Sequence, residues 1–195
     1  MKYYKITILQ VALVLAMVSA NISCNTNKTE DSKEKAEDAN DANFEKNSNE
    51  KDARFLVDVA EMNMEEINLG KLSQVKGTHS SVKELGKMME TSHIAAMASL
   101  TALAKSKMIT LPTSTTDDVN EAYQKLDKKS GKEFDKDYAD MMVEGHKHAI
   151  KLFEKAAAEC VDIEIKTFAS ESLPELRTHL DQALKCQKEC EEMKK

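Results

Sequence analysis

The chain has 195 residues, a formal net charge of −6, 5% aromatic residues and no tryptophan. From residue 55 onward it carries 20 basic against 25 acidic side chains, which excludes the basic surface expected of a nucleic-acid-binding protein. Only two prolines are present, Pro112 and Pro174, and no run of alternating β-branched residues occurs, so the composition predicts an all-α protein.

The first 23 residues have the layout of a secretory signal peptide. Two lysines precede a mostly apolar run over 6–20, which is shorter than the roughly 20 residues needed to span a bilayer. Residues 21–24, NISC, then resemble a bacterial lipobox with Asn21 in place of the usual aliphatic residue. We therefore expect Cys24 to carry a lipid that anchors the protein in the cell envelope, at the outer membrane, facing the periplasm or the cell surface. The alternative is ordinary cleavage a few residues earlier, which leaves Cys24 as a free thiol.

A charged segment follows this cysteine. Residues 25–54 contain nine acidic and six basic residues, and Phe44 is their one large apolar residue. Such a composition cannot bury enough apolar surface to offset the entropy lost on ordering. We therefore predict a disordered charged tether over 24–51 and one folded domain over 52–195, which is long enough for a single core.

Hydrophobic residues recur at helical spacing through the folded domain. They predict four long helices and a short helix in the longest connector; the ranges are 52–76, 81–107, 117–128, 132–160 and 162–188. Four long amphipathic helices with one longer connector predict a four-helix bundle.

Capping residues mark the ends of these helices. Ser81–Glu84 and Ser130–Glu133 have the spacing of capping boxes, in which the two side chains bind unpaired backbone amides. Asp162 is predicted to cap the last helix, and Pro174 to introduce a kink or an irregular turn within it.

Polar residues interrupt the apolar stripes of the four long helices near their midpoints. Glu66, His93, His146 and His179 each lie three or four residues from apolar neighbours on their own helix. Helix midpoints meet at one level whether a bundle helix runs up or down, so we expect these side chains in one central layer. Glu90 stands three residues before His93, and this spacing places both donors on one helix face.

Two interpretations of this layer stay open. Imidazole and carboxylate donors suit iron, copper, zinc or manganese, and the candidate metal ligands are Glu66, Glu90, His93, His146 and His179. The alternative is a metal-free hydrogen-bond network that fixes the register of the helices, or histidines that face the solvent. Nearby methionines are interpreted as core packing, although thioethers also suit Cu(I); they are Met62, Met88, Met89, Met141 and Met142.

The remaining histidines and the cysteines give weaker signals. His79 precedes a helix and His148 lies at the edge of its stripe. Cys186 and Cys190 stand four residues apart in the last helix, where they could bind a soft metal, link two chains into a dimer or remain plain thiols. Cys160 is too far along the chain from them for a disulfide with Cys186.

The sequence contains none of the common catalytic motifs. No phosphate-binding glycine loop, serine elbow or papain-like cysteine setting occurs. A di-iron carboxylate site is not expected either, because only Glu90 and His93 match the Glu-x-x-His pairs that such sites use. The sequence therefore favours a non-enzymatic protein.

Four segments follow one another in the order of a known bacterial family. They are RFLVDVAEMNMEEINLGKLS, VKELGKMMETSH, SGKEFDKDYADMMVEGHKHAIKLFEKAA and FASESLPELRTHL, and the match covers about 54–183. Together they resemble domain-of-unknown-function family 4142, whose members are often labelled exported or outer membrane proteins. The resemblance implies a ferritin-like helical bundle in the bacterial envelope and implies no settled activity.

The family pattern maps onto a small set of residues in this sequence, namely Glu66, His93, His146, Pro174 and His179. Family members commonly have an aspartate directly before the first two of these histidines. Here those positions hold Ser92 and Gly145. If the aspartates orient the imidazole rings, another group must do so in this protein.

Overall fold

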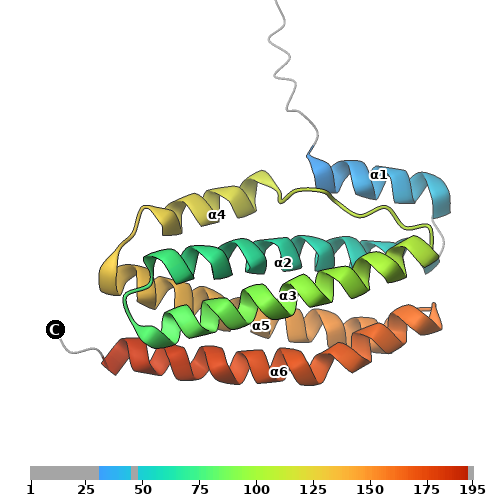
Figure 1. Cartoon of the computed structure of the whole chain (residues 1–195). Coiled ribbons are helices and arrows are strands. Elements are labelled where there is room, and N and C mark those ends of the chain that lie inside the picture. The colour runs from blue at the N-terminus through green and yellow to red at the C-terminus, as the bar shows by residue number, and fades with distance from the viewer. Residues whose placement is uncertain (1–30, 45–47, 193–195) are drawn as a thin grey trace, which may run out of the picture.

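The computed structural model describes residues 31–44 and 48–192, and all regular structure in these ranges is helical. The prediction of an all-α bundle is confirmed (Figure 1). Six helices follow in order: α1 Ser32–Phe44, α2 Ser48–Lys76, α3 Ser80–Ser106, α4 Asp117–Asp127, α5 Gly131–Glu159 and α6 Ile163–Glu192. Among the described helices, none is both long and apolar enough to cross a membrane.

The four long helices form two antiparallel hairpins. Short turns join α2 to α3 and α5 to α6, and the helices of each hairpin pack along their full length. The connector that contains α4 leads back along the outside of the bundle, so that α5 starts at the same end as α3 (Figure 1). Contacts of α3 with α6 and of α2 with α5 close the ring of four helices around one interior.

A buried aspartate from each hairpin holds the turn of the other hairpin. Asp52, near the start of α2, accepts hydrogen bonds from the backbone amides of Val161 and Asp162, the latter at 2.7 Å. Asp135, near the start of α5, accepts hydrogen bonds from the backbone amide of His79 at 2.9 Å and from Thr78. These contacts satisfy amides that have no partner within their own helices and fix how the hairpins sit against each other.

The helix starts differ in part from the predicted caps. His79, and not Ser81, is the N-cap of α3, and its Nδ1 accepts from the Ser81 amide. Ser130 is the N-cap of α5 without a side-chain bond, because the left-handed Gly131, with φ of +60°, sets the entry into the helix. Asp162 caps α6 as predicted, accepting from the amides of residues 164 and 165. The helix continues through Pro174 without an irregular turn.

Part of the predicted disordered tether is helical. The described residues of 24–51 include all of α1 and the first residues of α2, which begins at Ser48 and not at residue 52. The prediction rested on the low content of apolar residues, and it failed because α1 is held mainly by specific polar contacts and not by a large apolar face. The signal peptide, Cys24 and the rest of 24–30 lie outside the described residues.

Two sets of contacts hold α1 in place. The Asn40 amide, 1% exposed, donates to the Thr110 carbonyl at 2.9 Å and accepts from its amide at 2.8 Å, as a neighbouring strand would. Lys33 forms ion pairs with Asp58 at 2.7 Å and Glu61 at 2.9 Å on α2. These contacts tie α1 to α2 and to the connector after α3.

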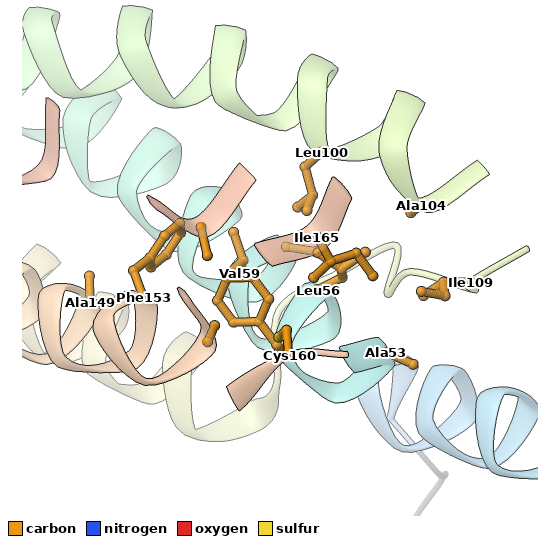
Figure 2. Close-up of a cluster of buried hydrophobic side chains, with 14 of the residues drawn as sticks. Ala53, Leu56, Val59, Leu100, Ala104, Ile109, Ala149, Phe153, Cys160 and Ile165 are labelled. Carbon is orange, nitrogen blue, oxygen red and sulfur yellow. The ribbon is translucent and has the colours of Figure 1, made fainter. Parts of the chain in front are cut away.

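The hydrophobic core is divided into two clusters along the bundle axis. The first, near α1, joins Leu56, Leu100, Phe153 and Ile165 from the four long helices (Figure 2). The second fills the opposite half; among its members are Leu69, Met89, Phe134, Tyr138, Met142 and Cys186. In every long helix the residues between the two clusters are those of the predicted polar layer.

Helices α2 and α3 approach closely at two glycines. A Cβ atom on Gly86 would lie 1.8 Å from the Ser73 hydroxyl oxygen and 2.8 Å from the Gly70 carbonyl oxygen. Ser73 is fully buried and donates a hydrogen bond to that carbonyl at 3.0 Å. Only glycine therefore fits at position 86 without a shift of the backbone.

We predict that Gly86→Ala destabilises the protein by about 1–3 kcal/mol through overpacking, although alanine favours helices by about 1 kcal/mol over glycine. Urea unfolding followed by circular dichroism measures the change. Ser99→Ala, an exposed position of the same helix, is the control and should change the free energy of unfolding by less than about 0.5 kcal/mol. A Gly86→Ala variant as stable as the unchanged protein would contradict the close helix contact.

Candidate metal centre

Three histidines from three helices meet at the centre of the bundle. His93 on α3, His146 on α5 and His179 on α6 are 6%, 1% and 4% exposed. Their ring centroids are 5.4–5.8 Å apart. One ring nitrogen from each lies within 4.8 Å of the other two. We refer to these residues as the histidine triad.

Hydrogen bonds orient two of the three rings. His93 Nδ1 lies 2.7 Å from the side-chain oxygen of Asn63 on α2, and His146 Nδ1 lies 2.9 Å from the Met142 carbonyl oxygen one turn earlier on α5. Both oxygens accept hydrogen bonds, so Nδ1 carries the proton in each ring and Nε2 keeps its lone pair. This is the arrangement that prepares an imidazole to bind a metal through Nε2.

The third ring is held differently. His179 Nε2 lies 3.7 Å from a carboxylate oxygen of the exposed Glu175, one turn earlier on α6, while its Nδ1 is buried. Among the described residues, each ring of the triad has one buried nitrogen without a hydrogen-bond partner: Nε2 of His93, Nε2 of His146 and Nδ1 of His179. A buried polar atom without a partner costs about 1–3 kcal/mol, so three of them in one place form a candidate binding site.

The electrostatic environment keeps the triad neutral. Burial lowers the pKa of His93 to about 3, with a further contribution from His146 and His179. Burial also lowers the pKa of His146 to about 4, against the hydrogen bond to Met142, which raises it, and burial lowers the pKa of His179. Neutral imidazoles are the form that binds metals, so near pH 7 no proton has to leave these rings before an ion binds.

Glu66 lies beside the triad. Its carboxyl group is buried on α2, with Oε1 3.8 Å from His146 Nδ1 and Oε2 without a hydrogen-bond partner among the described residues. Burial, and secondarily the charge of Glu65, raise the pKa of Glu66 to about 8. The raised pKa of Glu66 and the lowered pKa of His146 leave both groups neutral near pH 7. The two side chains are therefore close together but do not form an ion pair.

A small residue makes room for this carboxyl group. A Cβ atom on Gly145 would lie 3.3 Å from Glu66 Oε1, so a larger side chain at this position would crowd it. Gly145, one of the two departures from the family pattern, thus lies directly beside the Glu66 carboxyl group. Ser92, the other departure, borders a cavity of about 40 Å³ next to His93 and His179.

The structure places Glu90 away from the triad. Its carboxylate accepts a hydrogen bond from the Gln74 side chain at 2.7 Å, and it packs where α3 crosses Gly70 on α2. Of the five predicted ligands, His93, His146 and His179 thus converge, Glu66 lies beside His146, and Glu90 lies elsewhere. Glu90 and His93 are three residues apart on α3 and so differ in direction around the helix axis. His93 faces the central layer, whereas Glu90 faces α2.

A cavity of about 30 Å³ lies between Glu66, His93 and His146 and is otherwise bordered mainly by apolar side chains. This volume is close to that of one water molecule. The space beside the rings is therefore small, and it adjoins two of the three histidines of the triad.

The remaining sequence candidates have other roles. His79 caps α3 and His148 is exposed. Met89 and Met142 are buried in the second cluster, as predicted for core packing. Asn63, which orients His93, was not identified from the sequence. It could have been found because Asn63, like Glu66 about one turn later, is a polar residue on the buried face of α2.

The fold and the triad together define a helical-bundle protein with a buried tri-histidine centre. The family model described as Domain of unknown function (DUF4142) matches residues 26–185, and the chain belongs to this family. The matched range includes α1 to α5 and α6 up to residue 185. No curated protein and no solved structure matches the sequence significantly.

The pKa shifts predict how stability depends on pH in the metal-free protein. The triad histidines titrate near 6.5 when unfolded and well below that when folded, so the unfolded chain takes up protons first and stability falls as the pH drops below 6.5. Glu66 acts in the opposite sense: its contribution is complete below pH 4.5 and is lost as the pH rises through about 8.

We therefore expect His93→Gln to reduce the loss of stability between pH 7 and pH 5 by about 2 kcal/mol, since one of the shifted histidines is removed. Urea unfolding with a chelator present, at several pH values, measures this. His148→Gln, on the surface of the same bundle, should keep the original pH dependence. Equal pH dependence in His93→Gln and the unchanged protein would show that His93 is not held neutral by burial.

Proposed function

We propose that the protein binds one first-row transition metal ion at the histidine triad, with storage or buffering of the metal as its role. The observation that carries this proposal is the set of three buried ring nitrogens that converge without hydrogen-bond partners among the described residues. They come from His93, His146 and His179, on three different helices.

The spacing of these nitrogens fits a bound ion after a small movement. Metal–imidazole bonds of about 2.0–2.1 Å place the nitrogens of a tetrahedral site about 3.3 Å apart. The nitrogens of the triad lie within 4.8 Å of one another, so small rotations of the rings suffice. Three imidazoles suit zinc, copper or iron.

The competing hypothesis is a metal-free network that fixes helix register. Such a network stabilises a fold only when its members satisfy one another. Here the three ring nitrogens and Glu66 Oε2 have no partners within the described chain. The unsatisfied atoms therefore favour metal binding, and the small cavity supports a binding role over catalysis on an organic substrate.

We further propose that the bundle is ferritin-like and works in the bacterial envelope as a lipoprotein. A four-helix bundle with one long crossover is the connectivity of ferritin-like folds, and the connector containing α4 is such a crossover. The signal-peptide layout and Cys24 support attachment to a membrane. Metabolic labelling with a fatty acid tests the lipid: label that persists in Cys24→Ser would refute it.

For the metal, we expect the full-length protein, purified untagged without chelator, to contain close to one equivalent of a transition metal. Elemental mass spectrometry measures the content, and the metal-free protein should bind Co(II) with the visible spectrum of a tetrahedral site. His93→Ala and His146→Ala should each lose the metal while keeping their helix content. His148→Ala, a matched surface variant, should retain it.

Two results would contradict metal binding at the triad. One is a protein that is empty as purified and ignores added iron, copper, zinc and manganese. The other is metal content that survives His93→Ala or disappears equally in His148→Ala. Either result would make the triad a structural contact.

The hydrogen bond from His93 to Asn63 gives a second test. Asn63→Ala should weaken metal binding about 10–100-fold, because it frees the ring that Asn63 orients without removing a ligand. Competition with a chelator of known affinity measures the change. Asn68→Ala, exposed on the same helix, should leave the affinity unchanged, and equal affinities for the two variants would deny Asn63 this role.

A further inference from the structure

A second group of metal donors lies in the other half of the bundle. Cys186 and Cys190, four residues apart on α6, are 2% and 7% exposed, and both thiols are free. They follow His179 on the same buried face of the helix, and Cys186 comes two turns after it, about 10 Å along the axis. The triad does not use them.

The surroundings of this pair suit a soft cation. Cys186 borders a cavity of about 330 Å³ together with Met88, Ser81 and Lys185. The hydroxyl oxygen of Ser81 lies 3.6 Å from Cys186 Sγ. The cavity therefore brings the Met88 thioether close to the thiol and gives an ion a route to it, and the carboxylates of Glu84 and Glu189 on its border favour a cation.

We propose that Cys186 and Cys190 form a Cu(I) site, with Met88 as a third, weaker ligand. Binding breaks two S–H bonds, forms two Cu–S bonds and releases two protons to the solvent, with no change of oxidation state. The bound monovalent cation neutralises one of the two negative charges of the resulting dithiolate. Thiolate and thioether donors select Cu(I) over harder ions.

The spacing of the pair favours a bridging ion over a disulfide. Residues four apart on a helix have Cβ atoms about 5–6 Å apart, whereas a disulfide needs about 3.5–4.5 Å. Two thiolates on opposite sides of one ion, each bonded at about 2.3 Å, lie about 4.5 Å apart. The intact helix can therefore hold an ion between Cys186 and Cys190, but must distort to join their sulfurs.

The donor count favours a monovalent ion over zinc. Structural zinc sites use four histidine or cysteine ligands, and among the described residues the triad is the one place where three or more histidine, cysteine or carboxylate donors converge. Interaction with the Cys190 thiol, and then with Ser81, lowers the pKa of Cys186, while the same interaction and burial raise the pKa of Cys190.

The test is a Cu(I) titration of the reduced full-length protein without oxygen, against a chromophoric Cu(I) chelator. All variants carry His93→Ala, so that the triad does not contribute. We expect one equivalent to bind tightly and to protect Cys186 and Cys190 from alkylation. Cys186→Ser and Cys190→Ser should each weaken binding at least about 100-fold, and Met88→Leu less, as expected for the loss of a weaker ligand.

Cys160→Ser and Cys24→Ser are the matched controls and should keep full Cu(I) affinity. Circular dichroism verifies that each serine variant is folded. Protection from alkylation is measured on protein that retains both Cys186 and Cys190, so this result does not depend on the folding of the serine variants. The proposal is overturned if Cu(I) stays bound in the Cys186→Ser/Cys190→Ser double variant, or is lost equally in Cys160→Ser. It is also overturned if peroxide yields a Cys186–Cys190 disulfide while Cu(I) does not bind.

Discussion

The burial of three imidazole rings at one level of the bundle is the constraint on which the rest of the structure depends. Each ring must remain neutral, and each has two nitrogens to satisfy. Asn63 accepts a hydrogen bond from Nδ1 of His93, and the Met142 carbonyl accepts one from Nδ1 of His146. In both rings Nε2 is then left without a partner among the described residues. The apolar clusters above and below exclude water from the layer, and this exclusion both lowers the histidine pKa values and raises the cost of leaving the inward nitrogens unpaired.

Placing these rings at one level requires two hairpins in fixed register. Two aspartates fix this register. Asp52 of the first hairpin binds the turn between α5 and α6, and Asp135 of the second hairpin binds the turn between α2 and α3, at the opposite end of the bundle. The same spacing then recurs in both hairpins: Asn63 follows Asp52, and His146 follows Asp135, by eleven residues, which is about three helical turns. A polar side chain from α2 and one from α5 therefore reach the centre at matching heights. The Gly70–Gly86 contact adds a close crossing of α2 and α3 below this level.

Sequence periodicity predicts the parts of this arrangement that depend on repeated apolar burial. The four long helices, α4 and the meeting of His93, His146 and His179 follow from it because a polar residue inside an apolar stripe must face the core. Glu90 was misplaced because a separation of three residues leaves the helix rotation undecided until the partner helix is known. The helix α1 could not be predicted, since it depends on contacts of Asn40 and Lys33 with residues that are distant in the chain. The His79 cap was missed for a different reason: the ring accepts a local hydrogen bond from the amide of Ser81, the residue that was itself predicted as the cap.

Helix α6 contributes to both proposed metal sites, and its sequence separates their chemistry. His179 contributes an imidazole to the triad, whose nitrogen donors are of intermediate softness. Cys186 and Cys190 begin two turns further along the same face and pack in a cluster of apolar side chains that includes methionines. Ala183, fully buried between them, carries no donor, so an ion at one site has no ligand with which to bridge to the other. Because ligand type and geometry select metals more than raw affinity does, the two proposed sites would favour different ions.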